Sequence, residues 1–341
     1  MNTPTGASTR PILSARSLSV RLGGARPWLG KTREAVRAVD QVDIDLHPGE
    51  ILGLVGESGC GKTTLGRTLL GQQRESDGEI RLRERPVSGL APLAARSARA
   101  EISYVHQDPG AALDPWWSIG GAMHESLQVA GDSNRANRQR RIDAMLTAVG
   151  LDPAMQARYP HELSGGQLRR IGLARVLILE PSIVILDEPT SGLDLSVQAT
   201  VLRLFKDLRT RFNLTYLFIS HDLSVIRLIC DRVAVMYLGR IVETGPAAQL
   251  FESPRHPYTR ALLAAAPRFD PYGVPAKPAL LGDPPSATRL PQGCRFSPRC
   301  RYATTACAST DPVLESVDEA HRVACIRWQE TDLMNGEGAE R

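Results

Sequence analysis

The 341-residue sequence lacks any long hydrophobic run. No apolar stretch approaches the roughly 18 residues of a membrane-spanning helix, so we expect no membrane span. Residues 1–11 are polar and have no apolar centre, which argues against a secretory signal peptide. The sequence therefore predicts a cytosolic protein, in which any role at a membrane requires other subunits.

A strong charge of either sign is also lacking. The chain has 41 basic and 37 acidic residues, which leaves a net charge of +4. The basic residues are scattered, so a nucleic-acid partner is allowed by the charge but not indicated, and we predict none. No internal repeat is visible. With 42% hydrophobic and 23% charged residues, the composition is that of an ordinary globular protein of about two domains.

Cysteine is scarce and unevenly placed. Two of the six cysteines, Cys60 and Cys230, stand apart. The other four crowd into the C-terminal tail: Cys294, Cys300, Cys307 and Cys325. In a reducing compartment such crowding favours a metal or a cluster over disulfides. Proline and glycine also become frequent after about residue 265, which predicts a separate C-terminal extension.

The sequence does contain a phosphate-binding loop. Residues 56–63 read GESGCGKT, a pattern whose backbone N–H groups surround an anion together with the N-terminus of the next helix. Lys62 is expected to reach the outer phosphates, and the Thr63 hydroxyl to bind Mg²⁺. A short apolar strand over 51–55 precedes the loop and a helix over 64–70 follows it. The loop predicts a nucleoside triphosphate ligand without showing how its energy is used.

A second part of the nucleotide site is predicted at the end of another apolar strand, 183–186. Asp187 and Glu188 follow this strand directly, and parallel strands deliver their C-terminal residues to the sheet edge where phosphates bind. Asp187 is placed to hold Mg²⁺ through water, and Glu188 to polarise an attacking water. The alternative is a pair of solvated acids after a core strand. The alternation of strands and helices predicts an α/β fold with a largely parallel sheet.

Residues 163–167 read LSGGQ and begin a helix. Ser164 is expected to cap this helix with Gln167 as its capping-box partner, and the two glycines leave N–H groups exposed at its start. Plain capping is one interpretation. The other is a second anion site, which in a chain that already has one phosphate loop would serve a nucleotide held by another subunit.

In this order the motifs resemble those of the ATP-binding subunits of ABC transporters, over residues 12–265. Three further segments match the family: Gln107 the Q-loop, residues 191–194 the D-loop and His221 the switch histidine. The resemblance implies a P-loop NTPase cassette with a RecA-like parallel sheet, an antiparallel β portion and a helical subdomain, whose helical insert lies near residues 110–160. It implies an ATP-binding domain over 12–265 and a small cysteine-containing extension over 266–341.

The resemblance also implies that two such domains close head to tail around two ATP molecules. Glu188 is then the catalytic base, His221 holds it in register with the γ-phosphate, and Gln107 senses Mg²⁺ and water. The ATP-binding residues of one chain would be Gly56, Glu57, Ser58, Gly59, Cys60, Gly61, Lys62, Thr63 and Thr64, with Mg²⁺ held by Thr63, Gln107 and Asp187. The residues facing the ATP of the partner would be Ser164, Gly165, Gly166, Gln167 and Asp194.

One feature of the family is not matched. Its members usually stack adenine on an upstream aromatic residue, but the segment 18–22 places Leu22 near that point. Trp28 is a candidate substitute, and a tryptophan packed on the domain surface is an equal alternative.

Residues 237–243 (YLGRIVE), residues 256–263 (HPYTRALL) and the cysteine tail resemble di/oligopeptide and nickel importer subunits. This implies an ATPase that powers import of di- or oligopeptides, with nickel or another peptide-like solute as the alternative. The implied partners are a second ABC ATPase subunit, identical or homologous, two transmembrane permeases and a peptide-binding receptor, at the cytoplasmic face of the inner membrane. A soluble ABC ATPase fits less well, because the chain has one cassette and no room for a coiled-coil insert.

The four tail cysteines are separated by five, six and seventeen residues, and none of these gaps is the tight knuckle of most structural zinc sites. Four thiolates suffice for an iron–sulfur cluster, and the resemblance implies a [4Fe–4S] cluster there. Zinc, free thiols and disulfides stay open as alternatives. His321 is a weaker ligand candidate, and a surface histidine is the default interpretation.

Overall fold

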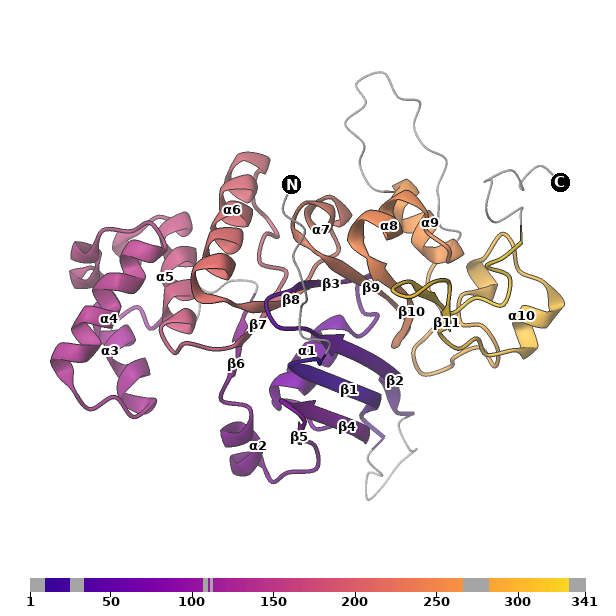
Figure 1. Cartoon of the computed structure of the whole chain (residues 1–341), viewed down its shortest axis with the longest axis horizontal. Coiled ribbons are helices and arrows are strands. Elements are labelled where there is room, and N and C mark those ends of the chain that lie inside the picture. The colour runs from indigo at the N-terminus through magenta and orange to yellow at the C-terminus, as the bar shows by residue number, and fades with distance from the viewer. Residues whose placement is uncertain (1–9, 25–33, 107–109, 111–112, 266–281, 331–341) are drawn as a thin grey trace.

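The short apolar runs of the sequence form the strands of one large sheet (Figure 1). The computed structural model describes residues 10–24, 34–106, 110, 113–265 and 282–330. The parallel part of the sheet has the order β9, β3, β8, β7, β6, with bounds Arg232–Tyr237, Ile51–Val55, Thr215–Ile219, Ile183–Asp187 and Ile102–Val105. β3 and β8 are buried along their whole length, as expected for parallel strands covered on both faces. The predicted α/β fold with a largely parallel sheet is confirmed.

The C-terminal extension joins the other edge of this sheet. β10 (Arg240–Pro246) runs antiparallel to β9, and the extension adds β12 (Arg322–Val323) to β10 and β11 (Glu315–Ser316) to β12. The short helix α10 (Thr305–Ser309) lies in the same extension. The composition shift after residue 265 predicted a separate extension, whereas in the structure its last strands continue the main sheet. The prediction and the structure differ because the extension pairs its backbone with β10, and amino-acid composition carries no information about such pairing.

A second, antiparallel sheet faces the main sheet. Its order is β2, β1, β4, β5, with bounds Val36–Leu46, Leu13–Leu22, Asp77–Leu82 and Arg85–Pro86. The alternation of apolar and polar residues over 39–46 predicted such a strand, and β2 contains it. Helix α1 (Lys62–Leu70) packs between the two sheets. One apolar core fills this space, with fully buried side chains from both sheets and from α1, among them Leu13, Leu46, Leu54, Leu65 and Ile185.

The other face of the main sheet is covered by helices. These are α5 (Gly165–Leu177), α6 (Leu195–Phe212), α7 (Leu223–Ile229), α8 (Ala247–Glu252) and α9 (Pro257–Ala265). They form a second core with the sheet, centred on buried aromatic residues such as Phe205, Tyr216 and Phe218. In the part of the chain that the structure describes, none of the helices combines the length and apolarity needed to cross a bilayer.

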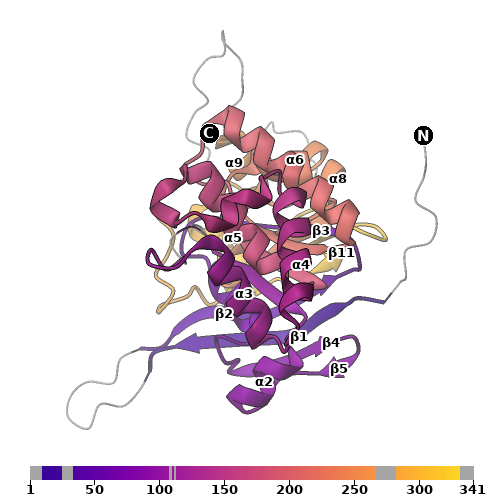
Figure 2. The same cartoon turned by 90° about the vertical axis from the view of Figure 1, so that its left-hand side faces the viewer.

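A helical insert projects from one end of the main sheet (Figures 1 and 2). After α2 (Pro92–Ala98) and β6, it consists of α3 (Ile119–Val129), α4 (Arg135–Ala148) and two short 3₁₀ turns before α5. The prediction of a mostly helical segment over 110–160 is confirmed for its described part.

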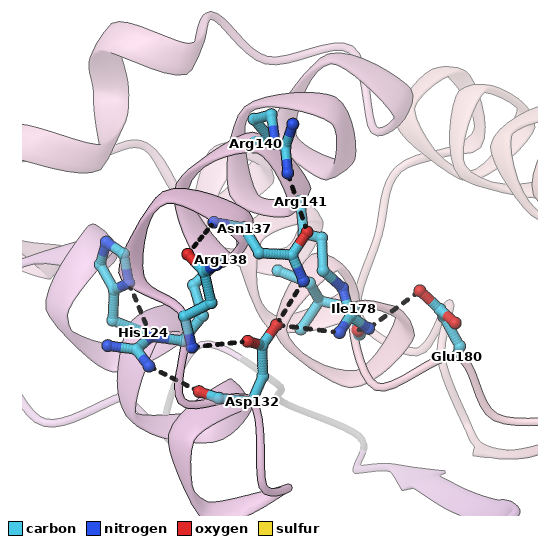
Figure 3. A network of polar contacts seen from close by, with 9 residues as sticks. His124, Asp132, Asn137, Arg138, Arg140, Arg141, Ile178 and Glu180 are labelled. Atoms are coloured by element: carbon cyan, nitrogen blue, oxygen red, sulfur yellow. Dashed lines mark hydrogen bonds and ion pairs between the residues drawn. The ribbon is translucent and has the colours of Figure 1, made fainter.

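A polar network anchors α4 to the C-terminal end of α5 (Figure 3). Arg141 donates to the carbonyl oxygen of Ile178 at 2.7 Å and to the carboxylate of Glu180 at 2.9 Å, and it also pairs with Asp132. The side chain of Asn137 donates to Asp132 at 2.8 Å. The insert is therefore joined to the end of α5 that lies opposite its LSGGQ start.

Candidate functional site

The phosphate loop connects β3 to α1, and its shape requires glycine. Gly56 and Gly61 have φ values of 154° and 111°, which side chains with a Cβ rarely adopt. A Cβ at Gly61 would lie 2.0 Å from the carbonyl oxygen of Ala38, and a Cβ at Gly56 would lie 2.1 Å from that of Met236. The loop thus fits tightly between the two sheets, at the carboxyl edge of the parallel strands where phosphate sites form.

Lys62 spans this loop from inside. Its ammonium group donates to the carbonyl oxygens of Gly56 at 2.7 Å and Glu57 at 2.9 Å, and only 6% of the residue is exposed. The thiol of Cys60 lies 3.8 Å from the same nitrogen. Burial raises the pKa of this thiol, although the charge of Lys62 opposes the shift. The Lys62 ammonium group therefore lies inside the loop, at the place where phosphates are expected to bind.

Asp187, at the end of β7, faces the start of α1. Its carboxylate accepts a hydrogen bond from the Thr63 hydroxyl at 3.3 Å and another from the Tyr104 hydroxyl at 2.5 Å. Burial and then the bond to Asp187 raise the pKa of Tyr104, which therefore stays a protonated donor. The structure thus brings together Thr63 and Asp187, two of the three predicted Mg²⁺ ligands.

Tyr104 belongs to the site, although no sequence motif pointed to it. Tyr104 lies on β6, next to β7, and is only 9% exposed. A buried tyrosine hydroxyl needs a hydrogen-bond partner. This requirement, applied to a tyrosine just before the Q-loop segment, is the signal that could have found it.

Glu188 and His221 meet at the ends of β7 and β8. The Nδ1 atom of His221 lies 3.0 Å from Oε1 of Glu188. Glu188 has a positive φ of 50°, and its N–H donates to the carbonyl oxygen of Ile219 on β8 at 2.9 Å. This turn directs its side chain away from that of Asp187 and toward His221. Two residues that are 33 positions apart thus form one acid–imidazole pair beside the phosphate loop.

The LSGGQ segment begins α5 with the predicted capping box. The Ser164 hydroxyl accepts from the Gln167 N–H at 3.3 Å, and the Gln167 side chain accepts from the Ser164 N–H at 2.9 Å. Gly165 and Gly166 are exposed, and a Cβ on either would meet no atom within 4 Å. Within this chain, then, nothing sterically requires glycine at these two positions. Capping is confirmed, and it does not explain the glycines.

Asp194 caps the next helix, α6. Its carboxylate accepts from the Ser196 hydroxyl at 2.6 Å and from the N–H groups of Ser196 and Val197, and these bonds lower its pKa, the Ser196 hydroxyl most. Arg169 of α5 donates to the carbonyl oxygen of Ser191 at 3.2 Å. This contact, which the sequence did not predict, joins α5 to the D-loop.

Two predicted residues lie outside the described residues: Gln107, the proposed Q-loop sensor, and Trp28, the candidate for adenine stacking. Their predicted roles therefore stay predictions.

The four tail cysteines line one small cavity of about 20 Å³, together with His256, Phe296 and Tyr302. Burial raises the pKa of Cys300 to about 11 and that of Cys325 to about 12, so as free groups they are protonated at neutral pH. Four thiols around one cavity suit a thiophilic metal or cluster in number and chemistry. Among the residues that the structure describes, however, no three His, Cys, Asp or Glu side chains are arranged to hold a metal ion.

His321 is not at the surface, and the default interpretation of this residue was wrong. It is completely buried, and its Nε2 atom lies 2.8 Å from Oε1 of Glu243, which is also completely buried. Glu243 accepts two further hydrogen bonds, from the N–H groups of Arg255 and His256. The imidazole therefore fastens the extension to β10 and does not line the cysteine cavity.

Comparison with known proteins agrees with this geometry. The ABC transporter family profile matches residues 39–191, and the profile of the oligopeptide/dipeptide transporter C-terminal region matches residues 242–307. A Brucella ovis protein whose name describes a peptide import ATP-binding protein is 45% identical over 318 residues, which cover 93% of this chain and 98% of that protein. The di/tripeptide transport ATP-binding protein DppF of Pseudomonas aeruginosa is 43% identical and covers 92% of this chain and 97% of its own.

Solved structures show the same fold. CbiO1 of Clostridium perfringens, part of an ABC transporter complex, superimposes with a TM-score of 0.61 at 26% identity, over 71% of this chain and 91% of that one. The ATP-binding cassette MJ0796 superimposes with a TM-score of 0.59 at 22% identity, over 69% of this chain and 98% of that one. The predicted cassette fold is confirmed, and the chain belongs to the ATP-binding proteins of ABC transporters, in the group with the oligopeptide/dipeptide transporter C-terminal region.

Proposed function

We propose that this chain is the ATP-hydrolysing subunit of an importer of di- or oligopeptides. The observation that carries the proposal is that two sets of predicted nucleotide-binding residues stand apart in this chain, and we take them as the two halves of a shared site. One half is the phosphate loop with Asp187, Glu188 and His221. The other is the exposed start of α5, and no hydrogen bond or ion pair of the described residues joins it to the loop. The names of the relatives support a peptide as the transported solute.

The proposed roles follow from the contacts in the first half. Lys62 and the other loop residues from Gly56 to Thr64 would bind the phosphates of ATP. Thr63 and Asp187 supply the oxygen ligands that Mg²⁺ prefers, and Gln107 would be a third ligand. Mg²⁺ when bound would neutralise charge on the phosphate oxygens. Glu188 would orient and deprotonate the attacking water, and His221 at 3.0 Å would hold Glu188 in place.

The second half would act on the ATP of a partner subunit. The open surface at Gly165 and Gly166, capped by Ser164 and Gln167, offers helix N–H groups to an anion. Asp194 would lie at the seam of the pair. Closure of two cassettes would exclude water from both sites and complete the shell of donors around the γ-phosphate. The partner would be a second copy or a homologous subunit.

Co-purification tests the transport role. When the chain is captured from detergent-solubilised membranes, we expect two integral membrane proteins and a cassette partner to come with it. Addition of peptide and its receptor should raise the ATPase rate of this assembly and leave that of the isolated chain unchanged. Capture of ribosomes or DNA in place of membrane proteins would contradict the proposal and favour a soluble ABC ATPase.

For the cysteine site we propose a [4Fe–4S] cluster held by Cys294, Cys300, Cys307 and Cys325. The support is that all four thiols line one cavity and that the donor set is the one such clusters use. Thiols with raised pKa values lose their protons when a cluster binds, so occupation would depend on pH. A cluster there would serve to hold the extension together, because a small proline-rich segment lacks a sizeable core of its own.

Anaerobic purification of the full chain tests this site. We expect brown protein that contains iron and sulfide in equal amounts, and we expect Cys300→Ser to lower both severalfold. The matched control is Cys230→Ser, which removes a buried cysteine outside the cavity and should leave the iron content unchanged. Colourless protein with zinc, or with no metal, would overturn the cluster assignment.

A further inference from the structure

One residue of the phosphate loop is held from outside the loop by two distant side chains. Glu57 donates its N–H to the hydroxyl of Tyr258, on α9, at 2.9 Å. Its carboxylate accepts from both terminal nitrogens of Arg299, at 2.7 and 3.0 Å. Arg299 belongs to the C-terminal extension and is 242 positions away in the sequence. None of the nucleotide motifs contains either partner.

Arg299 is fixed in its place. Only 4% of its side chain is exposed, and its guanidinium lies over the ring of Tyr237 at 5.9 Å from the centroid. The hydrogen bonds to Glu57 are the main cause of its raised pKa. Tyr237, Tyr258 and Phe296 pack against one another with ring centroids 4.6 to 5.4 Å apart. A two-pronged arginine–carboxylate pair on such a rigid aromatic support defines a geometry as well as a charge.

Glu57 passes this geometry on to Lys62. Its carbonyl oxygen accepts from the Lys62 ammonium group at 2.9 Å, while its N–H and its carboxylate are held by Tyr258 and Arg299. The peptide group before Glu57 is therefore held by Tyr258 of α9, and the side chain of Glu57 is held by Arg299 of the extension. The Lys62 ammonium group, which is expected to bind the phosphates, is oriented by its hydrogen bond to the carbonyl oxygen of Glu57.

We propose that Arg299, together with Tyr258, is a positioning residue for the phosphate loop, so that docking of the C-terminal extension sets the affinity of the cassette for ATP. The inference rests on the proposed function in that it takes ATP as the ligand of the loop. Cys300 follows Arg299 directly and lines the cysteine cavity. Disorder at the cysteine cavity would therefore displace Arg299 and weaken ATP binding through the Arg299–Glu57 ion pair.

Direct MgATP binding and steady-state hydrolysis by the full chain test this proposal. We expect Arg299→Ala to raise the Kd and the KM for ATP about tenfold and to change kcat less than about twofold, because a charged hydrogen-bond pair is lost while the catalytic groups are untouched. Arg299→Lys, which keeps the charge but loses the two-pronged geometry, should fall in between. If Arg299→Ala does not fold, Arg299→Lys and Glu57→Gln carry the measurement.

Asp311→Ala is the matched control. Asp311 accepts from Arg240 at 2.6 Å and so also joins the extension to the cassette, but neither residue is in the phosphate loop. This variant should leave the affinity for ATP unchanged, and Arg299→Ala should weaken ATP binding less in a Glu57→Gln background than in the wild type. Equal affinities of the wild type and Arg299→Ala, or an equal loss in Asp311→Ala, would overturn the inference. Failure of the wild type itself to bind ATP would instead contradict the proposed function.

Discussion

Glu188→Gln is expected to lower kcat for ATP hydrolysis by at least about a hundredfold while the affinity for ATP stays within about twofold, because a general base contributes roughly that much to a rate. The amide keeps the size of the side chain and its hydrogen bond to His221, which is 3.0 Å long in the wild type, but it cannot take a proton from water. ATP then binds without being consumed. Steady-state kinetics measures kcat, and direct nucleotide binding measures the affinity for ATP. Size-exclusion chromatography with MgATP tests for a third consequence, a lasting closed pair of cassettes.

Glu180→Gln provides the control for this experiment. It removes one carboxylate of the same type, but Glu180 is 72% exposed and pairs with Arg141 at the far end of α5, as Figure 3 shows. Its kcat should equal that of the wild type. Hydrolysis at the normal rate in Glu188→Gln would remove Glu188 from the role of base. A loss of ATP affinity in the same variant would instead assign the residue to binding.

The predictions that succeeded at the level of structure rest on local patterns. The phosphate loop, the capping box of Ser164 and Gln167, and the acidic end of β7 are each written in a few consecutive residues, and backbone geometry turns such patterns directly into shape. The family resemblance added order and spacing, and it placed Glu188 and His221 in one site before their contact was seen. The residue roles themselves await the experiments proposed above.

The contacts that the sequence did not reveal join distant segments. Tyr104 reaches Asp187 across two neighbouring strands, and His321 reaches Glu243 across the pairing of β12 with β10. Arg299 reaches Glu57 from the C-terminal extension, 242 positions away in the sequence. Most buried tyrosine, histidine and arginine side chains have a hydrogen-bond partner, so the residue type predicts that one exists. It does not say which one, because the partner depends on strand order, and strand order is a property of the whole fold.

Gly166→Asp is expected to leave the isolated chain as stable as the wild type, or more stable by up to about 1 kcal/mol, because glycine is a poor helix residue and an acid is favourable in the first turn of a helix. A Cβ at this position meets no atom within 4 Å. In a closed pair the same carboxylate would lie where the γ-phosphate of the partner's ATP is bound, and like charges repel strongly where water is excluded. We therefore expect kcat to fall by at least about a hundredfold.

The contrast between stability and activity is what makes Gly166→Asp decisive for a site shared between two chains. Ala136→Asp is its matched control, since Ala136 is exposed and holds the same position, second in the helix, at the start of α4. It places the same charge at the N-terminus of α4 on the insert, directly before Asn137 of the polar network, and should keep full activity. Thermal unfolding and ATPase rates of both variants give the comparison. If Gly166→Asp hydrolyses ATP at the wild-type rate, the glycines of α5 do not face a nucleotide, and each chain must complete its site alone.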